Sequence, residues 1–126
     1  METVTCVMEC ELEPERVYAK LVDPVLIPQW APVFAESVEP VGGSTYRVTK
    51  GGDIFSLEVV PHEADFAVEY LRDLPGGKRG GAYVRAMPRG QGGSVISMRM
   101  PVGPNATPEQ VQAVLERELQ TLIRLA

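Results

Sequence analysis

Residues 14–24 read PERVYAKLVDP, and Trp30 follows six residues after this segment. The segment predicts a short helix over residues 14–21. Pro14 suits the first turn of a helix, where a missing backbone N–H costs nothing, and the Asp-Pro pair at the end of the segment stops it. The apolar residues at helical spacing form its buried stripe: Val17, Tyr18 and Leu21. A second short helix is expected over residues 25–29.

The segments on either side of these helices have the pattern of β-strands. A strand is expected over residues 3–11, which are rich in β-branched and apolar side chains. After residue 33 the apolar period changes to two, and glycine-rich turns separate the alternating segments. Six further strands are expected, over residues 34–39, 45–49, 54–60, 66–72, 82–87 and 94–100. Short strands joined by tight turns predict an antiparallel meander.

The last expected element is one long helix over residues 108–125. Thr107 is a suitable N-cap, Pro108 fits the first turn, and Glu109 complements the helix dipole. At about 100° per residue, the apolar side chains collect on one side: Val111, Val114, Leu115, Leu119, Leu122 and Leu125. An amphipathic helix of this kind is suited to lie across a sheet.

The 126 residues include 12 glycines and 11 prolines, with 44% apolar and 23% charged residues. These values predict one turn-rich domain over residues 1–126 and argue against a coiled coil, a long helical bundle or a multi-domain enzyme. The formal net charge of −5 argues against nucleic-acid binding, which relies on basic surfaces. The main concentration of basic residues lies beside glycine turns and is interpreted as solvated turn charge: Lys78, Arg79, Arg85, Arg89 and Arg99.

The N-terminal residues and the two cysteines indicate the cellular compartment in which the protein is expected. Residues 1–3 carry no basic charge and no long apolar stretch follows them, so no signal peptide is expected. The apolar runs are far shorter than the ~20 residues that span a bilayer, so stable membrane insertion is not expected. Cys6 and Cys10 on one face of a strand would lie about 13 Å apart, too far for a disulfide. Reduced cysteines and the lack of a Cys/His cluster predict a cytoplasmic protein without a metal site.

Residues 14–24 together with Trp30 resemble the opening of the START-like superfamily, the group of polyketide cyclase/dehydrase and lipid-transport proteins. This superfamily is also called SRPBCC and shares its fold with the birch-pollen allergen. Members typically read Pro-Pro-Glu-x-Val-Trp-x-x-Leu-x-Asp and then a Trp, whereas this chain has Glu13 at the first proline and Tyr18 at the first tryptophan. The order of elements extends the resemblance to nearly the whole chain, including ELQTL at residues 118–122.

The resemblance implies an α+β helix-grip fold. A curved antiparallel sheet of about six to seven strands would wrap the long C-terminal helix, with two short helices after the first strand. Members hold lipids, sterols, polyketides or other apolar molecules in a cavity between sheet and helix. The expected function is therefore binding of a small hydrophobic ligand, without a cofactor. Two alternatives stay open: a polyketide cyclase or dehydratase using the same cavity, and a co-chaperone-like interaction module. A bacterial origin is implied, and a homodimer stays open.

Glu118 and His62 are candidate site residues. On the helical wheel Glu118 lies inside the apolar arc of the last helix. A carboxylate there either orients a ligand or acts in acid–base chemistry, or it leaves at the rim to pair with an arginine such as Arg85 or Arg99. His62, the only histidine, is a natural general base near neutral pH, or simply an exposed loop residue.

The expected central strands supply more candidates. If Tyr83 and Arg85 face the helix together with Met98 of the next strand, the cavity is lined by Met and Tyr with one cation. Such a cavity suits an apolar ligand that bears a carboxylate or a phenol. In the opposite arrangement Val84 and Ala86 point inward and Arg85 lies outside, and the alternation leaves both arrangements open. In the enzymatic alternative, proton transfer would be assisted by Glu118, His62, Tyr83 or Arg85.

Trp30 is expected to pack at one end of the cavity. The full set of expected ligand contacts is Trp30, Tyr70, Tyr83, Arg85, Met98, Leu115, Glu118 and Leu122. The glycine-rich segment at residues 76–81 lacks the G-x-x-x-x-G-K-[ST] spacing of a phosphate loop and precedes a strand. It is expected to form a flexible hairpin turn and a mobile lid over the cavity.

Overall fold

The computed structural model describes residues 2–74 and 76–126. After strand β1 (Thr3–Cys10) the chain forms helix α1 (Pro14–Leu21), a 3-10 turn (Pro24–Leu26) and helix α2 (Ile27–Trp30). The remaining elements are β2 (Ser37–Gly42), β3 (Thr45–Lys50), β4 (Asp53–His62), a 3-10 turn (Glu63–Asp65), β5 (Ala67–Leu74), β6 (Lys78–Pro88), β7 (Ser94–Pro101) and helix α3 (Pro108–Leu125).

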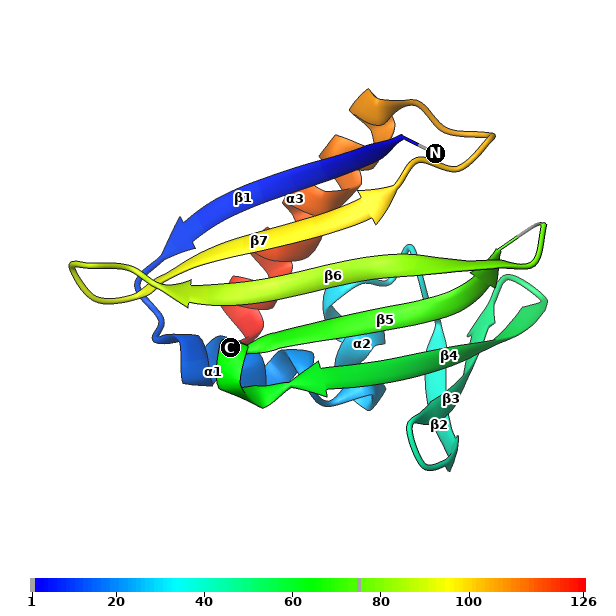
Figure 1. The fold of residues 1–126 in the computed structure, drawn as a ribbon, viewed down its shortest axis with the longest axis horizontal. Helices are drawn as coiled ribbons and strands as arrows, with labels where there is room; N and C mark the ends of the chain where they lie inside the picture. Colours follow the sequence, from blue (N-terminus) through cyan, green and yellow to red (C-terminus); the bar gives the residue numbers. More distant parts are fainter. Residues whose placement is uncertain (1, 75) are drawn as a thin grey trace.

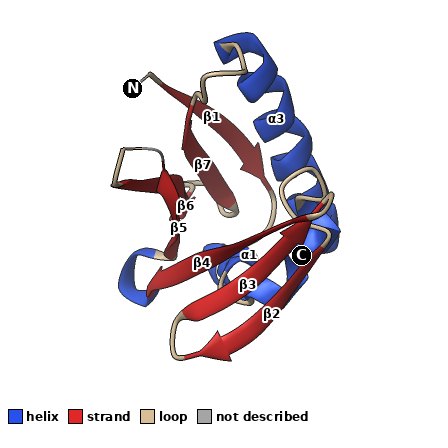
Figure 2. Ribbon diagram, turned by 90° about the vertical axis from the view of Figure 1, so that its right-hand side faces the viewer, coloured by secondary structure: helices blue, strands red, loops and turns tan. Residues whose placement is uncertain are grey.

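The strands form one antiparallel sheet of seven strands in the order β1-β7-β6-β5-β4-β3-β2. Each strand from β2 to β6 pairs with the next strand in sequence. Strand β1 pairs with β7, so the N-terminal strand lies next to the last one. The sheet is strongly curved, and α3 crosses its β1–β7 side while α1 and α2 lie below (Figures 1 and 2). The predicted helix-grip fold is therefore confirmed.

The first and the last predicted helix start and end where local sequence signals place them. Helix α1 spans Pro14–Leu21 with proline in its first turn, and α3 spans Pro108–Leu125. The Thr107 hydroxyl accepts a hydrogen bond from the Gln110 backbone N–H (3.2 Å), and the Gln110 side chain accepts one from the Thr107 N–H (2.9 Å). This capping box satisfies backbone donors that every helix N-terminus leaves free.

Three predicted boundaries are wrong, each for a local reason. The strand expected over residues 34–39 begins at Ser37, because residues 34 and 35 donate to the Ala31 carbonyl and extend the turn after α2. The strand expected from residue 66 begins at Ala67, because Phe66 has a left-handed backbone with φ of 51°. The turn expected over residues 76–81 is shorter, because β6 already starts at Lys78. Position 75 lies outside the described residues.

The core lies between the inner face of the sheet and the helices. Leu115, Leu119 and Leu122 of α3 are fully buried, and so are Val17 and Leu21 of α1. The sheet contributes alternate residues of its strands, among them Val48, Leu57, Val68, Val84 and Ile96. Cys6 and Cys10 are buried free thiols in this core. Among the described residues, none of the helices has both the length and the apolar character needed to cross a membrane.

Gly81 allows β5 and β6 to approach closely. A Cβ at this position would overlap the carbonyl oxygen of Tyr70 on β5. At the preceding residue, Gly80, a Cβ would instead meet the Leu74 side chain, 2.7 Å from its Cδ1 atom. The backbone contact cannot move aside as a side-chain end can, so position 81 requires glycine.

Candidate functional site

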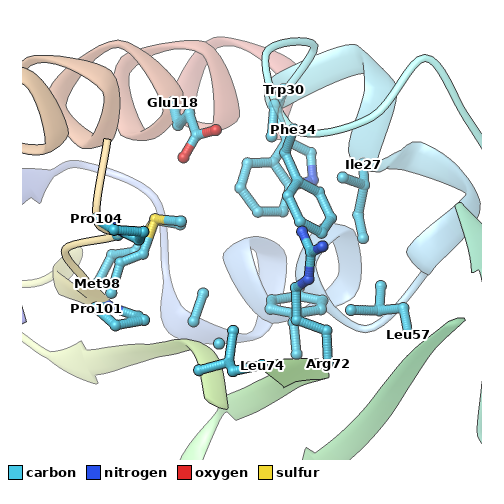
Figure 3. Close-up of a pocket in the computed structure, with 16 residues that line it drawn as sticks. Ile27, Trp30, Phe34, Leu57, Arg72, Leu74, Met98, Pro101, Pro104 and Glu118 are labelled. Atoms are coloured by element: carbon cyan, nitrogen blue, oxygen red, sulfur yellow. The ribbon is translucent and has the colours of Figure 1, made fainter. Parts of the chain in front are cut away.

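A cavity of about 270 Å³ lies between the sheet and the helices. Its walls come from α2 and the turn after it, from strands β4 to β7, from the segment after β7, and from α3. Figure 3 shows these walls, with Met98, Pro101 and Pro104 on one side and Trp30, Phe34 and Ile27 on the other. Nearly all lining side chains are apolar, which is the usual character of a site for a small organic molecule.

Aromatic rings form one wall of the cavity. The rings of Trp30 on α2 and Tyr70 on β5 have centroids 6.2 Å apart at an angle of 57°. Phe34 adds a third ring, and it packs edge-on against Phe55 of β4 with centroids 5.6 Å apart. Trp30 and Tyr70 are almost fully buried. The rings are therefore held in place by the surrounding packing and present a rigid surface to the cavity.

Glu118 brings a carboxyl group into this apolar cavity. The residue lies on α3 among fully buried leucines and is itself only 5% exposed. Figure 3 shows its carboxylate pointing from α3 into the cavity. Its Oε1 atom has no hydrogen-bond partner in the described part of the chain. Burial raises the pKa of Glu118 to about 7, while the Arg117 charge acts in the opposite direction. Glu118 can therefore exchange a proton near neutral pH.

Arg72 brings a positive charge to the same cavity from the opposite wall (Figure 3). It lies on β5, and its guanidinium carbon sits 3.9 Å from the centroid of the Phe55 ring. The Arg72 Nε atom is buried and has no hydrogen-bond partner among residues 2–74 and 76–126. Arg72 and Phe34 also line a shallower surface pocket, so these two side chains form the wall between that pocket and the cavity.

Arg72 was not among the residues expected at the site, although the sequence contains a signal for it. Strand β5 alternates, so Val68, Tyr70 and Arg72 share one face. Val68 and Tyr70 are both buried against the core. An arginine on the same strand face, two residues beyond a buried tyrosine, indicates that the inner face has to accommodate a positive charge at that point. Because Tyr70 was among the expected ligand contacts, alternation along the same strand could have placed Arg72 at the cavity as well.

Two more polar groups of the cavity wall differ in how they are satisfied. The Tyr70 hydroxyl donates to the backbone carbonyl of Leu21, and burial raises its pKa above the ordinary value. The Trp30 indole N–H is buried without a hydrogen-bond acceptor in the described chain. Tyr70 is therefore occupied by a structural contact, whereas Trp30 still has a donor to offer.

Alternation left open which face of β6 is turned toward the helices. Burial decides this question, and it decides against Tyr83 and Arg85 as ligand contacts. Val84 and Ala86 are fully buried, so the inner face of β6 is the one that carries them. Arg85 lies on the outer face, 42% exposed, with its guanidinium 3.8 Å from the Asp65 carboxylate. Tyr83 lies on that face too, and the Arg99 guanidinium is 5.8 Å from its ring centroid. Neither Tyr83 nor Arg85 lines the cavity.

His62 is also outside the cavity. Its Nε2 atom is 2.8 Å from the Glu69 Oε1 atom, and the side chain is 39% exposed. Both residues alternate with inward-facing neighbours on their strands, so the pair belongs to the outer face of the sheet. This position removes His62 from chemistry in the cavity.

Of the ligand contacts expected on α3 and β7, some line the cavity and others do not. Met98 lines the cavity together with Met100. Leu115 and Leu122 do not line it, because both are fully buried in the packing between α3 and the sheet. The structure thus brings Trp30, Tyr70, Met98 and Glu118 together around one cavity. Within the described residues, no group of three His, Cys, Asp or Glu side chains is arranged to hold a metal ion.

Comparison with solved structures identifies the class of fold. A START superfamily protein from Mycobacterium smegmatis superposes with a TM-score of 0.71 at 16% identity, over 98% of this chain and 95% of that one. A protein from Deinococcus radiodurans gives a TM-score of 0.69 at 18% identity over all of both chains. The fold of this chain is therefore START-like, as the resemblance at residues 14–24 predicted.

A third similar structure is DynU16, a protein of the dynemicin biosynthetic locus, with a TM-score of 0.69 at 19% identity. The match covers 98% of this chain but only 46% of DynU16. No protein-family model and no curated protein sequence matches this chain. At these identities the likeness defines the fold, and the function has to be argued from the cavity itself.

Proposed function

We propose that this protein binds a small hydrophobic molecule in the cavity between the sheet and α3. The observation that carries the proposal is the cavity of about 270 Å³ with an almost wholly apolar lining. Protein cores are normally packed with few voids larger than a water molecule. A protein of this size can form a stable core without such a cavity, and an empty cavity loses the packing contacts of the side chains that line it. A bound apolar molecule would restore those contacts.

The volume sets the size of the molecule. An apolar cavity of roughly 150 Å³ accommodates benzene, so this cavity has room for about one to two rings or a short chain. A four-ring sterol exceeds it. Among the ligand classes considered from the sequence, a small aromatic or polyketide-like molecule therefore fits better than a large lipid. The bacterial, cytoplasmic and oligomeric assignments stay predictions.

The test is native mass spectrometry of protein purified from its own host, combined with thermal shift measurements against a panel of small aromatics, polyketides and lipids. We expect a bound mass or a raised melting temperature with the wild-type protein. Ala82→Phe places a ring at the cavity wall and should abolish both signals. Val95→Phe places the same aromatic side chain on the outer face of β7 and should abolish neither. A ligand-free protein with no thermal shift would contradict the proposal.

Glu118 supports an enzymatic alternative. A carboxyl group that exchanges a proton near pH 7 inside an apolar cavity is suited to acid–base catalysis, such as dehydration of a polyketide-like substrate. If the bound molecule is transformed, Glu118→Gln should still bind it but release it unchanged, whereas the wild-type protein releases a product that has lost water. Identical recovered molecules from both proteins would exclude this alternative and leave ligand binding in place.

A further inference from the structure

The ligand class can be narrowed by counting which polar groups of the cavity lack a partner. Four buried side-chain polar atoms have no hydrogen-bond partner in the described chain. Three of them belong to residues that line the cavity: Trp30 Nε1, Arg72 Nε and Glu118 Oε1. Native proteins satisfy the great majority of such atoms, because an unmade buried hydrogen bond is costly. Their concentration at one cavity indicates that a ligand supplies the missing partners.

The chemistry of the three groups differs, and the difference specifies the ligand. The indole N–H of Trp30 and the guanidinium N–H of Arg72 can only donate, so both require an acceptor on the ligand. Glu118 can accept as a carboxylate and can also donate as a carboxylic acid. A hydroxyl group on the ligand matches Glu118 in either state, because a hydroxyl both donates and accepts.

The charge balance of the cavity points to an anion. Arg72 stays protonated under all ordinary conditions, and no carboxylate among the described residues forms an ion pair with it. Its other side faces the surface pocket that Lys50 and Asp53 help to line. The guanidinium packs on the Phe55 ring, and an opposite charge in the cavity would stabilise it further and give the buried Nε–H an acceptor. A carboxylate matches the forked guanidinium geometry, because its two oxygens can accept two parallel N–H···O hydrogen bonds.

The shape and lining of the cavity point to an aromatic ring. Trp30, Phe34 and Tyr70 supply flat rings on one wall, and Met98 and Met100 supply thioethers across from them. Thioethers and aromatic rings both make favourable contacts with an aromatic ligand. The volume of about 270 Å³ limits that ligand to about one or two rings.

Resting on the function proposed above, we propose that the ligand of this cavity is a one- or two-ring aromatic carboxylate that carries a hydroxyl group. Arg72 and Trp30 bind the carboxylate, and Glu118 binds the hydroxyl at the other end. Figure 3 shows the arrangement this requires, with Glu118 entering the cavity from α3 and the Arg72 guanidinium from the opposite wall, on the side where the Trp30 ring lies. The hydroxyl and the carboxylate would then lie at opposite ends of the ring system.

The test uses 6-hydroxy-2-naphthoate as the probe, with 6-(hydroxymethyl)-2-naphthol as a neutral analogue of the same size. Binding of each is measured by fluorescence titration at pH 6. We expect the wild-type protein to bind the carboxylate roughly tenfold more tightly than the neutral analogue, or better, as for a charge-assisted contact. Arg72→Gln should remove this preference by weakening carboxylate binding alone, and Arg72→Lys should retain part of it. Arg85→Gln, on the outer face, should retain all of it.

The outcomes separate this inference from the function on which it rests. Equal affinities for the two probes in the wild-type protein, or an unchanged preference in Arg72→Gln, would overturn the assignment of Arg72 while leaving ligand binding intact. Failure of both probes to bind, in a protein that carries a ligand from its host, would overturn the aromatic carboxylate. Failure of both probes in a protein without any ligand would overturn the function as well. Melting temperatures of the variants confirm that each one is folded.

Discussion

The Tyr70 hydroxyl on β5 donates a hydrogen bond to the backbone carbonyl of Leu21, the last residue of α1. The last four carbonyl groups of a helix have no partner within the helix, and a buried one needs a partner from elsewhere. Tyr70 supplies that partner across 49 residues of sequence. The contact ties β5 to α1, and the Tyr70 ring stands in the cavity wall beside the ring of Trp30 on α2.

Tyr70→Phe should lower the free energy of unfolding by about 1–3 kcal/mol, because it leaves the buried Leu21 carbonyl without a donor. Denaturant unfolding measures this loss. The matched control is Tyr83→Phe on the outer face, whose hydroxyl makes no hydrogen bond within the described residues, and which should change stability by less than about 0.5 kcal/mol. Equal effects of the two substitutions would contradict a structural role for the Tyr70 hydroxyl.

Glu118 should make stability depend on pH. Its pKa is about 7 in the folded protein against an ordinary value of 4.5, so the folded state holds a proton that the unfolded state has released between these values. The free energy of unfolding should therefore fall as pH rises from about 4.5 to about 7, by at most about 3 kcal/mol, and then level off. Urea unfolding at a series of pH values measures this fall.

Two variants isolate the Glu118 contribution. Glu118→Gln has no proton to release, so the difference between wild-type and variant stability should change across the same pH range. Glu116→Gln removes the same charge from an exposed position of α3 and should leave the pH dependence of the wild-type protein intact. A wild-type curve that runs parallel to that of Glu118→Gln would show that Glu118 titrates normally.

Gly81→Ala should be strongly destabilising, by about 2–3 kcal/mol, because its Cβ would overlap the Tyr70 carbonyl oxygen and force β5 and β6 apart. The neighbouring Gly80→Ala should cost less, since the Leu74 side chain that it meets can rotate away. Thermal unfolding of both variants provides the comparison. A smaller loss at position 81 than at position 80 would be inconsistent with the close approach of these strands.

Phe34→Ala should speed both association and dissociation of a ligand, because Phe34 is part of the wall between the cavity and the surface pocket. Stopped-flow fluorescence with 6-hydroxy-2-naphthoate measures both rates. Val33→Ala is the control, since Val33 is 56% exposed and lines only the surface pocket. Unchanged rates in Phe34→Ala would place the route into the cavity elsewhere.

The secondary structure could be predicted where its signals are local. The first turn of α1, the capping box of α3 and the amphipathic stripes of both helices lie within a few residues of one another, so periodicity and capping chemistry were sufficient. The strand boundaries at residues 34 and 66 could not be predicted in this way. There, the Ala31 carbonyl and the left-handed backbone of Phe66 decide where pairing begins.

The residues that line the cavity show how much the alternation of side chains along a strand can predict. A period of two determines which residues of a strand share a face, but it does not determine which face is turned inward. For β5, alternation placed Val68 and Tyr70 on one face, and only burial in the folded protein shows that this face is turned inward. For β6 one face carries Ala82, Val84 and Ala86 and the other carries Tyr83, Arg85 and Met87, and alternation alone left either face acceptable as a cavity wall. Packing of β6 against α1 turns Val84 and Ala86 inward.

The amino-acid sequence alone determined the order of elements, the START-like helix-grip fold and the presence of a carboxylate in the apolar arc of α3. These properties depend on periodicity, turn residues and one local motif. Only the tertiary structure determined that Arg72 rather than Arg85 is the cation of the cavity, that the Tyr70 hydroxyl is bound to the Leu21 carbonyl, and that the cavity has a volume of about 270 Å³. Each of these depends on distances between segments far apart in sequence, which sheet curvature and helix packing set together.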